Sequence, residues 1–236
     1  MVYSACMCGR FALGIPQKRL EEVFGVAAPG DWAPSWNVAP GREALTVTAT
    51  DGVARADMRR FGLIPRWTKD AKIGHRMINA RSETVFDKPA FRDPVRRSRC
   101  LVPVQAFYEW KKVDGGKRPY AIAVEGADAF ALAGIASQWI DGRTGEVVDS
   151  FAVLTCEPNA LVASIHDRMP VVLPPESWAD WLDPSLDKGN RLSDLLAAYP
   201  ADAMRAWPVT PEVGNARNDG PELLSPWNPP KQVALL

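Results

Sequence analysis

The sequence predicts an α+β domain built around a largely antiparallel sheet or barrel, because short strand patterns outnumber short helical ones. Two turn signals carry this prediction. Asp51-Gly52 separates two strand-like segments as the turn of a hairpin does, and Asp141-Gly142 separates two more. With 236 residues, 47% of them hydrophobic, the chain is long enough for one sizeable core, or two small ones at most.

The individual elements follow from periodicity and from turn residues. Strands are expected at residues 44–50, 53–61, 100–104, 106–113, 120–125, 130–140, 147–155 and 171–173, and from residue 205 onward. Helices are expected at residues 16–24, 158–165, 174–182 and 192–198. A further helix, capped by Ser82 or Thr84, is expected in the basic stretch around Lys88. The segments at residues 29–41 and 62–75 are expected to be loops.

The formal net charge is zero, but the charges are unevenly distributed. Between Arg59 and Arg118 the chain carries 16 Lys and Arg against 6 Asp and Glu. Such a segment is a candidate surface for a polyanion such as nucleic acid, although solvated charge spread around a fold produces the same pattern.

Composition also indicates the compartment. No apolar run approaches the roughly 20 residues of a membrane span, and the opening MVYSAC lacks the features of a signal peptide. The four cysteines show no framework spacing, which favours a reducing compartment, the cytoplasm. Cys6-x-Cys8 and two distant histidines are too little to predict a metal site, and no cofactor is expected.

Cys8 follows Met7 directly. If translation begins at Met7 and that methionine is removed, Cys8 becomes the N-terminal residue and carries a free amine and a thiol on adjacent carbons. Such a pair closes a five-membered thiazolidine ring on an aldehyde, which no internal cysteine can do. The alternative is that Cys8 is a small buried hydrophobe, as most cysteines are.

Three further polar residues stand in settings that suggest chemistry. Glu109 lies between aromatic residues on a predicted strand, where burial would raise the pKa of its carboxyl and suit it to proton transfer; an exposed position beside the following lysines is the alternative. His166 ends a predicted helix and suits acid–base work, unless it is a capping or core residue. Asn79 is either a site residue or an ordinary turn residue.

Taken together, several segments resemble the SRAP family, also called SOS response-associated peptidases. The matching segments are MCGRF at 7–11, WNVAPG at 36–41, GLIPRW at 62–67, NARSE at 79–83, FYEW at 107–110, Thr155, IHDRMP at 165–170, VGN at 213–215 and PELL at 221–224. They run in family order from residue 7 to about 226. The resemblance implies a single compact α+β domain with a largely antiparallel, β-barrel-like core and flanking helices at residues 7–226. Residues 1–6 would be an extension, mis-assigned or processed off, and residues 227–236 a tail.

Members of this family trap abasic sites in single-stranded DNA, so the resemblance also implies residue roles. Cys8 corresponds to the catalytic N-terminal cysteine, Glu109 and His166 to the acid–base pair, and Asn79 to the residue that orients the adduct. DNA contacts are implied for five residues: Arg10, Trp67, Arg81, Thr155 and Arg168. The implied protein is a cytoplasmic, nucleoid-associated monomer that links covalently to DNA and has weak lyase and self-processing peptidase activity.

Two other functions remain open from the residues alone. One is a cysteine peptidase or amidase, with Cys8 as nucleophile, His166 as base, and Glu109 or Asn79 orienting it. The other is a non-covalent single-strand binding module that uses only the basic segment and the aromatic residues.

Overall fold

The computed structural model describes residues 8–186 and 190–228. The predicted N-terminal extension at residues 1–6, together with Met7, and most of the predicted C-terminal tail lie outside the described residues. In the described chain, five strands form a closed barrel in which neighbouring strands pair in the cyclic order β10, β4, β3, β6 and β9. Their bounds are β3 Glu43–Thr50, β4 Val53–Phe61, β6 Arg99–Val104, β9 Phe130–Ile140 and β10 Val147–Cys156. All pairings within the barrel are antiparallel except the one between β10 and β4.

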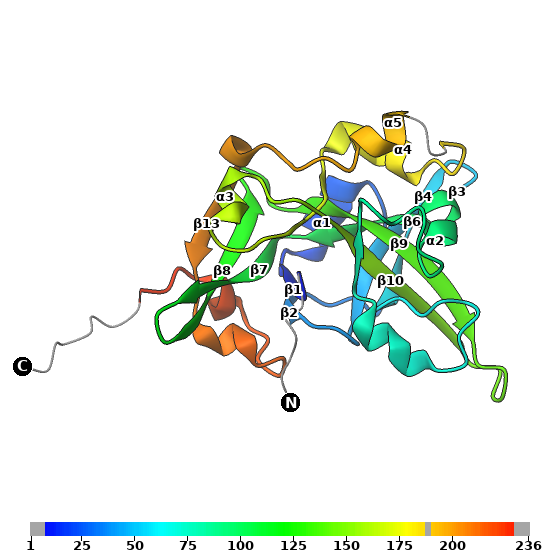
Figure 1. The fold of residues 1–236 in the computed structure, drawn as a ribbon, viewed down its shortest axis with the longest axis horizontal. Helices are drawn as coiled ribbons and strands as arrows, with labels where there is room; N and C mark the ends of the chain where they lie inside the picture. The colour runs from blue at the N-terminus through cyan, green and yellow to red at the C-terminus, as the bar shows by residue number, and fades with distance from the viewer. Residues whose placement is uncertain (1–7, 187–189, 229–236) are drawn as a thin grey trace, which may run out of the picture.

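A second sheet of five strands lies beside the barrel, in the order β13, β8, β7, β1 and β2 (Figure 1). Their bounds are β1 Arg10–Leu13, β2 Ser35–Val38, β7 Ala106–Val113, β8 Gly116–Val124 and β13 Met204–Pro208. The ring of Phe11 on β1 meets Phe61 of the barrel edge-on, with centroids 5.5 Å apart, and Phe61 stacks on Phe151. Phe11, three residues after Cys8, is thus part of the hydrophobic core that joins the two sheets.

Three short strands and ten short helical segments complete the fold. The strands are β5 Asn79–Arg81, β11 Met169–Pro170 and β12 Val172–Leu173. The α-helices are α1 Gln17–Phe24, α2 Arg92–Arg97, α3 Ala160–Ala163, α4 Trp178–Leu182 and α5 Asn190–Asp194. The 3-10 helices are η1 Ala71–Arg76, η2 Pro175–Ser177, η3 Ala201–Ala203, η4 Pro211–Gly214 and η5 Pro221–Leu224. None of the described helices has the length and apolarity needed to cross a membrane.

The predicted fold class and both hairpins are confirmed, whereas some local predictions are wrong. The helix expected from Ser82 or Thr84 is a series of turns, and the helical segment begins only at Arg92. Ser82 instead donates its backbone N–H to the carbonyl of Thr155 at 2.8 Å, so it continues the sheet edge and does not cap a helix. Four strands were missed in segments expected to be loops or left unassigned: β1, β2, β5 and β11.

Candidate active site

Cys8 lies two residues before the first residue of β1 and is completely buried. Strand β1 pairs antiparallel with β7, and Arg10 is opposite Tyr108 in that register. The chain just before β1 therefore runs beside Glu109, and the backbone N–H of Cys8 donates to Glu109 Oε1 at 2.7 Å. Cys8 has a φ of 38°, in the left-handed region that costs a non-glycine residue about 1–3 kcal/mol.

Glu109 is buried, with 1% of its surface exposed, so the exposed alternative is excluded. Burial raises the pKa of its carboxyl to about 8, while the hydrogen bond from Cys8 acts in the opposite direction. This confirms the sequence-based expectation of a raised pKa. A carboxyl group with a pKa near neutrality can both accept and donate a proton at the nitrogen of Cys8.

His166 faces the other oxygen of the same carboxyl group. Its Nε2 lies 3.9 Å from Glu109 Oε2, and its side chain is 15% exposed. On the other edge of the ring, the backbone N–H of Arg168 donates to Nδ1 at 3.1 Å. The carbonyl oxygen of Arg168 lies 3.3 Å from the same nitrogen, so Nδ1 has both a backbone donor and a backbone acceptor beside it, while Nε2 faces Glu109. Asp167 Oδ1 also lies 3.1 Å from Nδ1, where it attracts an imidazolium.

A second group of predicted residues lies along β5 and β10. These strands run parallel, with Asn79 opposite Val153 and Arg81 opposite Thr155. Arg168 joins this group because its Nη2 donates to the carbonyl of Thr155 at 2.8 Å. The hydrogen bond from the Arg168 backbone N–H to the His166 ring links the two groups. The structure therefore brings most of the predicted site residues to one region.

Glu83 is a site residue to which the sequence analysis assigned no role. Its carboxylate accepts two hydrogen bonds from the Arg168 guanidinium, at 2.6 and 2.8 Å. Arg168 in turn lowers the pKa of Glu83. Arg168 Nε and Thr155 Oγ1 are buried and form no hydrogen bond within the described residues, so both keep capacity for a ligand. The signal for Glu83 was its place in the NARSE segment, but nothing in the sequence indicates that it pairs with Arg168, 85 positions away.

Arg10, predicted to contact DNA, has partners within the protein. Its guanidinium donates to Asn37 Oδ1 at 2.9 Å and to the carbonyls of Val213 and Gly214 at 2.7 and 3.1 Å. The Asn37 amide donates to the same Val213 carbonyl and to two further carbonyls, those of Asn215 and Asn218. Arg10 and Asn37 therefore fix the segment after β13 against β2, and this geometry favours a structural role for Arg10.

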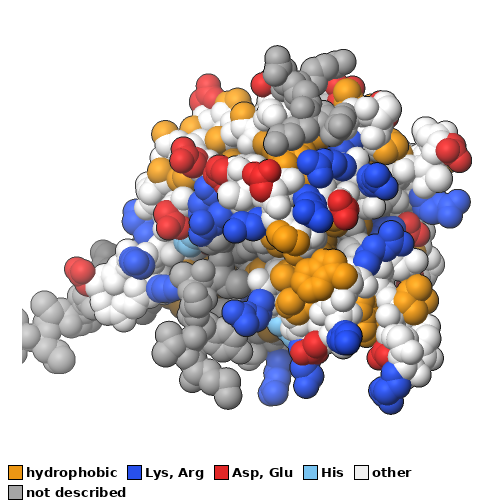
Figure 2. All heavy atoms as spheres, turned by 45° about the vertical axis from the view of Figure 1, so that its right-hand side comes forward, with side chains coloured by type: hydrophobic (Ala, Val, Ile, Leu, Met, Phe, Trp, Pro, Cys, Tyr) orange, Lys and Arg blue, Asp and Glu red, His pale blue; other side chains and the backbone are white. Residues whose placement is uncertain are grey.

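Trp67 lies beyond β4 and is 62% exposed, which is unusual for so large an apolar side chain. Figure 2 shows one face of the molecule, on which Lys and Arg side chains gather around hydrophobic ones. In the sequence, Trp67 directly follows Arg66 and is two residues before Lys69. An exposed indole near basic groups is the combination that stacks on nucleobases while cations neutralise phosphates.

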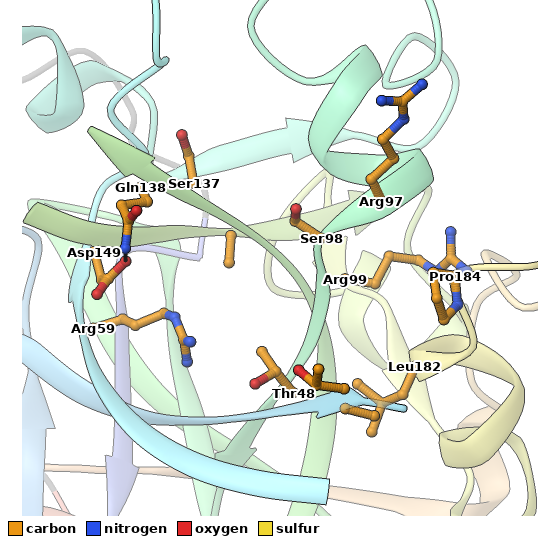
Figure 3. Close-up of a pocket in the computed structure, with 13 residues that line it drawn as sticks. Thr48, Arg59, Arg97, Ser98, Arg99, Ser137, Gln138, Asp149, Leu182 and Pro184 are labelled. Atoms are coloured by element: carbon orange, nitrogen blue, oxygen red, sulfur yellow. Dashed lines mark hydrogen bonds between the residues drawn. The ribbon is translucent and has the colours of Figure 1, made fainter. Parts of the chain in front are cut away.

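A separate pocket of about 240 Å³ lies at one end of the barrel, away from Cys8 (Figure 3). Three arginines line it, but Arg99 is not available to a ligand. All five of its N–H donors are used by backbone carbonyls, which belong to Val95, Arg96, Trp181, Asp183 and Leu186. The two other described cysteines are also poor candidates for chemistry, because burial raises the pKa of Cys100 to about 12 and that of Cys156 to about 11.

No group of three His, Cys, Asp or Glu side chains within residues 8–186 and 190–228 is arranged to hold a metal ion. The groups that meet at the Cys8 site are its backbone nitrogen, the buried carboxyl group of Glu109 and the imidazole of His166.

Comparison with known proteins gives consistent results. Residues 7–216 match the family described as SOS response associated peptidase (SRAP). The chain is 40% identical over 222 residues to the Bacillus subtilis abasic site processing protein YoqW, and the match covers 92% of this chain and 99% of that one. It is 30% identical to the Escherichia coli abasic site processing protein YedK, over 93% of this chain and all of that one. A crystal structure of a Bacteroides thetaiotaomicron protein aligns with a TM-score of 0.85 and 26% identity, covering 94% of this chain and all of that one.

Proposed function

Because the chain belongs to the SOS response associated peptidase family, we propose that it captures abasic sites in single-stranded DNA through a covalent bond to Cys8. The observation that carries this proposal is the 2.7 Å hydrogen bond between the Cys8 nitrogen and the buried carboxyl group of Glu109. It puts an acid–base group against the atom that would attack an aldehyde. The names of the relatives, abasic site processing proteins, support the choice of substrate.

The first chemical step is formation of an imine between the α-amine of Cys8 and C1′ of the ring-opened sugar. An α-amine has a pKa of about 7.7–8.0, so a substantial fraction is uncharged near neutral pH. Glu109 takes a proton from the amine as it adds and returns one to the departing oxygen, so that one water molecule is released. Its raised pKa suits both directions of this transfer.

The second step closes the ring. The Cys8 thiol sulfur adds to the imine carbon, the thiol proton ends on the nitrogen, and a five-membered thiazolidine results. His166 donates a proton to the sugar oxygen when the closed sugar opens. A base at the imine stage would also permit β-elimination, which accounts for a weak lyase activity.

Binding of the strand is assigned to the second group of residues. Arg81 and Arg168 neutralise phosphates, Trp67 stacks beside the gap left by the missing base, and Thr155 contacts the sugar–phosphate chain. Asn79, on the same strand as Arg81, orients the adduct. The unused hydrogen-bonding capacity of Arg168 Nε and Thr155 Oγ1 supports this assignment. We propose that the protein acts as a monomer on DNA in the cytoplasm.

The mechanism requires that Met7 be removed, because an amide nitrogen forms no imine. The strained φ of Cys8 supports this requirement. That torsion exists only while a residue precedes Cys8, so cleavage of the Met7–Cys8 bond relieves the strain. Cleavage also converts the amide into an ammonium group 2.7 Å from Glu109, and the two groups then share protons as a coupled pair.

Intact mass spectrometry tests the proposal. The protein is expressed from Met1 and from Met7 and incubated with a single-stranded oligonucleotide that carries one abasic site. We expect protein that begins at Cys8 to gain the mass of the oligonucleotide less one water. Cys8→Ala and Cys8→Ser, expressed from Met7, should gain none. Failure of protein with a free Cys8 to gain mass would exclude covalent capture and direct attention to peptidase substrates.

A further inference from the structure

The β7–β8 hairpin reaches beyond the strand that carries Cys8. Strand β1 pairs with β7 only as far as Tyr108, whereas β7 and β8 stay paired up to Val113 and Gly116. Beyond Glu109, this hairpin therefore projects past the reactive residues (Figure 1). Lys111 shares a face of β7 with Glu109, two residues and about 7 Å farther along the strand.

The projecting part carries an unfavourable arrangement of charge. Lys112 lies directly opposite Lys117, and Lys111 lies directly opposite Arg118. Like charges directly opposite on neighbouring strands are destabilising. In the part of the chain that the structure describes, no carboxylate forms an ion pair with any of these four cations. Glu109 interacts with Lys117 at longer range than an ion pair, so most of the positive charge of the hairpin has no carboxylate against it.

A pocket of about 340 Å³ lies between this hairpin and the loop that carries His166. Three lysines line it from the hairpin side: Lys111, Lys112 and Lys117. His166 and Asp167 line it from the other side, and Asp167 is the only carboxylate among its lining residues. The Asp167 side chain is 88% exposed and lies against the imidazole, so it offsets little of the lysine charge. His166 lines the pocket and also faces Glu109, so the pocket is continuous with the reaction centre through His166.

We propose that this pocket binds a backbone phosphate of the DNA strand next to the captured abasic nucleotide. An anion held by the lysines of the pocket relieves the repulsion between Lys112 and Lys117, and His166, which also faces Glu109, puts that anion next to the reaction centre. The inference rests on the proposed function for the identity of the anion, and it adds a set of positioning residues that the sequence analysis did not identify.

The proposal has a test that does not depend on covalent chemistry. Binding is measured by fluorescence anisotropy with an oligonucleotide carrying a tetrahydrofuran abasic analogue, which has no aldehyde and cannot react. Lys117→Glu and the double variant Lys112→Ala/Lys117→Ala are compared with Lys18→Glu, which makes the same single charge change on α1, away from the pocket. The double variant should raise the dissociation constant roughly tenfold at low salt and reduce the slope of log K against log salt by about 1.

Stability provides a second readout that separates binding from unfolding. Lys117→Glu replaces an opposed like-charge pair with an opposite-charge pair, so the thermal midpoint should rise by about 1–3 °C while DNA affinity falls. A fall in both quantities would assign the lysines to the fold and overturn the proposal. Equal affinities for Lys117→Glu and Lys18→Glu would also overturn it.

The phosphate itself is tested by replacing the linkages on either side of the analogue with neutral methylphosphonates. If the pocket binds one of these phosphates, neutralising that phosphate should lower the DNA affinity of the wild-type protein. The double lysine variant should then lose little further affinity for the neutralised oligonucleotide. Additive losses would show that the lysines act elsewhere and would contradict the proposal. Absence of covalent capture by the wild-type protein, with these binding results intact, would reject the proposed chemistry and leave the phosphate pocket standing.

Discussion

Arg99 and Glu109 are two buried ionisable residues in different parts of the molecule, and they differ in the number of hydrogen-bond partners around them. Arg99, 4% exposed, lies in the barrel under α4 and donates to five backbone carbonyls. Glu109, 1% exposed, lies on the second sheet and accepts a hydrogen bond from Cys8, with His166 too far away, at 3.9 Å, for a good hydrogen bond.

This difference separates a charge that stabilises the fold from a group that is suited to proton transfer. The barrel surrounds Arg99 with a backbone acceptor for each of its donors, which stabilises the connection between β6 and the segment after α4. The second sheet gives Glu109 fewer partners, so burial raises its pKa to about 8 and both of its protonation states are accessible. Charge alone does not distinguish the two places, because the barrel pocket is lined by three arginines (Figure 3).

The largest expected effect comes from Glu109→Gln. The amide keeps the size of the carboxyl group but cannot exchange a proton with the Cys8 amine, so the rate of covalent capture should fall about 10²–10⁴-fold. Single-turnover kinetics with an abasic oligonucleotide measure this rate. Glu176→Gln changes an exposed carboxylate on η2 and is the matched control, with an expected rate equal to wild type. A rate for Glu109→Gln within threefold of the control would remove Glu109 from the chemistry.

Arg99→Met is the corresponding change in the barrel. Five carbonyls lose their donor at once, so the free energy of unfolding should fall by about 3–5 kcal/mol in urea titrations. Arg97→Met, an exposed position at the end of α2, should change it by less than about 0.5 kcal/mol. A loss for Arg99→Met that matches the control would mean that the carbonyls find other donors.

The sequence predicted Glu109 better than Arg99, for a physical reason. Aromatic neighbours on a strand are local information, and they indicate a buried, perturbed carboxyl group from four adjacent residues. The partners of Arg99 are backbone carbonyls, some of them more than 80 residues away, and a carbonyl has no sequence signature. A barrel was among the predictions, but the strands that close it were not, because the parallel pairing of β4 with β10 depends on the path of the chain between them. Strands β1, β2 and β5 are three or four residues long, too short for a period of two to be visible.

The pH dependence of stability should distinguish Glu109 from an ordinary carboxyl group. Its folded-state pKa, about 8, exceeds the unfolded value near 4.5, so the native state binds the extra proton between these pH values. Its contribution is thus fully present below about pH 4.5 and is lost as pH rises through about 8. In protein that retains residues 1–7, the stability difference between wild type and Glu109→Gln should change across this window by at most about 5 kcal/mol. A difference that is constant with pH would contradict the raised pKa.

Removal of residues 1–7 sharpens this test. The new ammonium group next to Glu109 favours the carboxylate, so the same stability difference should vary less steeply with pH in protein that begins at Cys8. Mass spectrometry identifies the two forms before each titration. Identical pH profiles would show that the amine of Cys8 does not face Glu109.

The smallest expected effect belongs to Glu83 and Arg168, which lie between the two extremes. The Glu83 side chain is 45% exposed and that of Arg168 13%, so solvent screens their pairing despite its two short hydrogen bonds. A double-mutant cycle with Glu83→Gln and Arg168→Gln, followed in urea at pH 7, should give a coupling energy of about 0.2–1 kcal/mol. The pKa of Glu83 is lowered in the folded protein, so this coupling is present above about pH 4.5 and is lost as pH falls through the folded-state pKa. A coupling energy above about 2 kcal/mol would make Arg168 a structural cation like Arg99, because so strong a pair could not release its guanidinium to a phosphate. A weak one leaves Arg168 held in position by Glu83 but available to DNA.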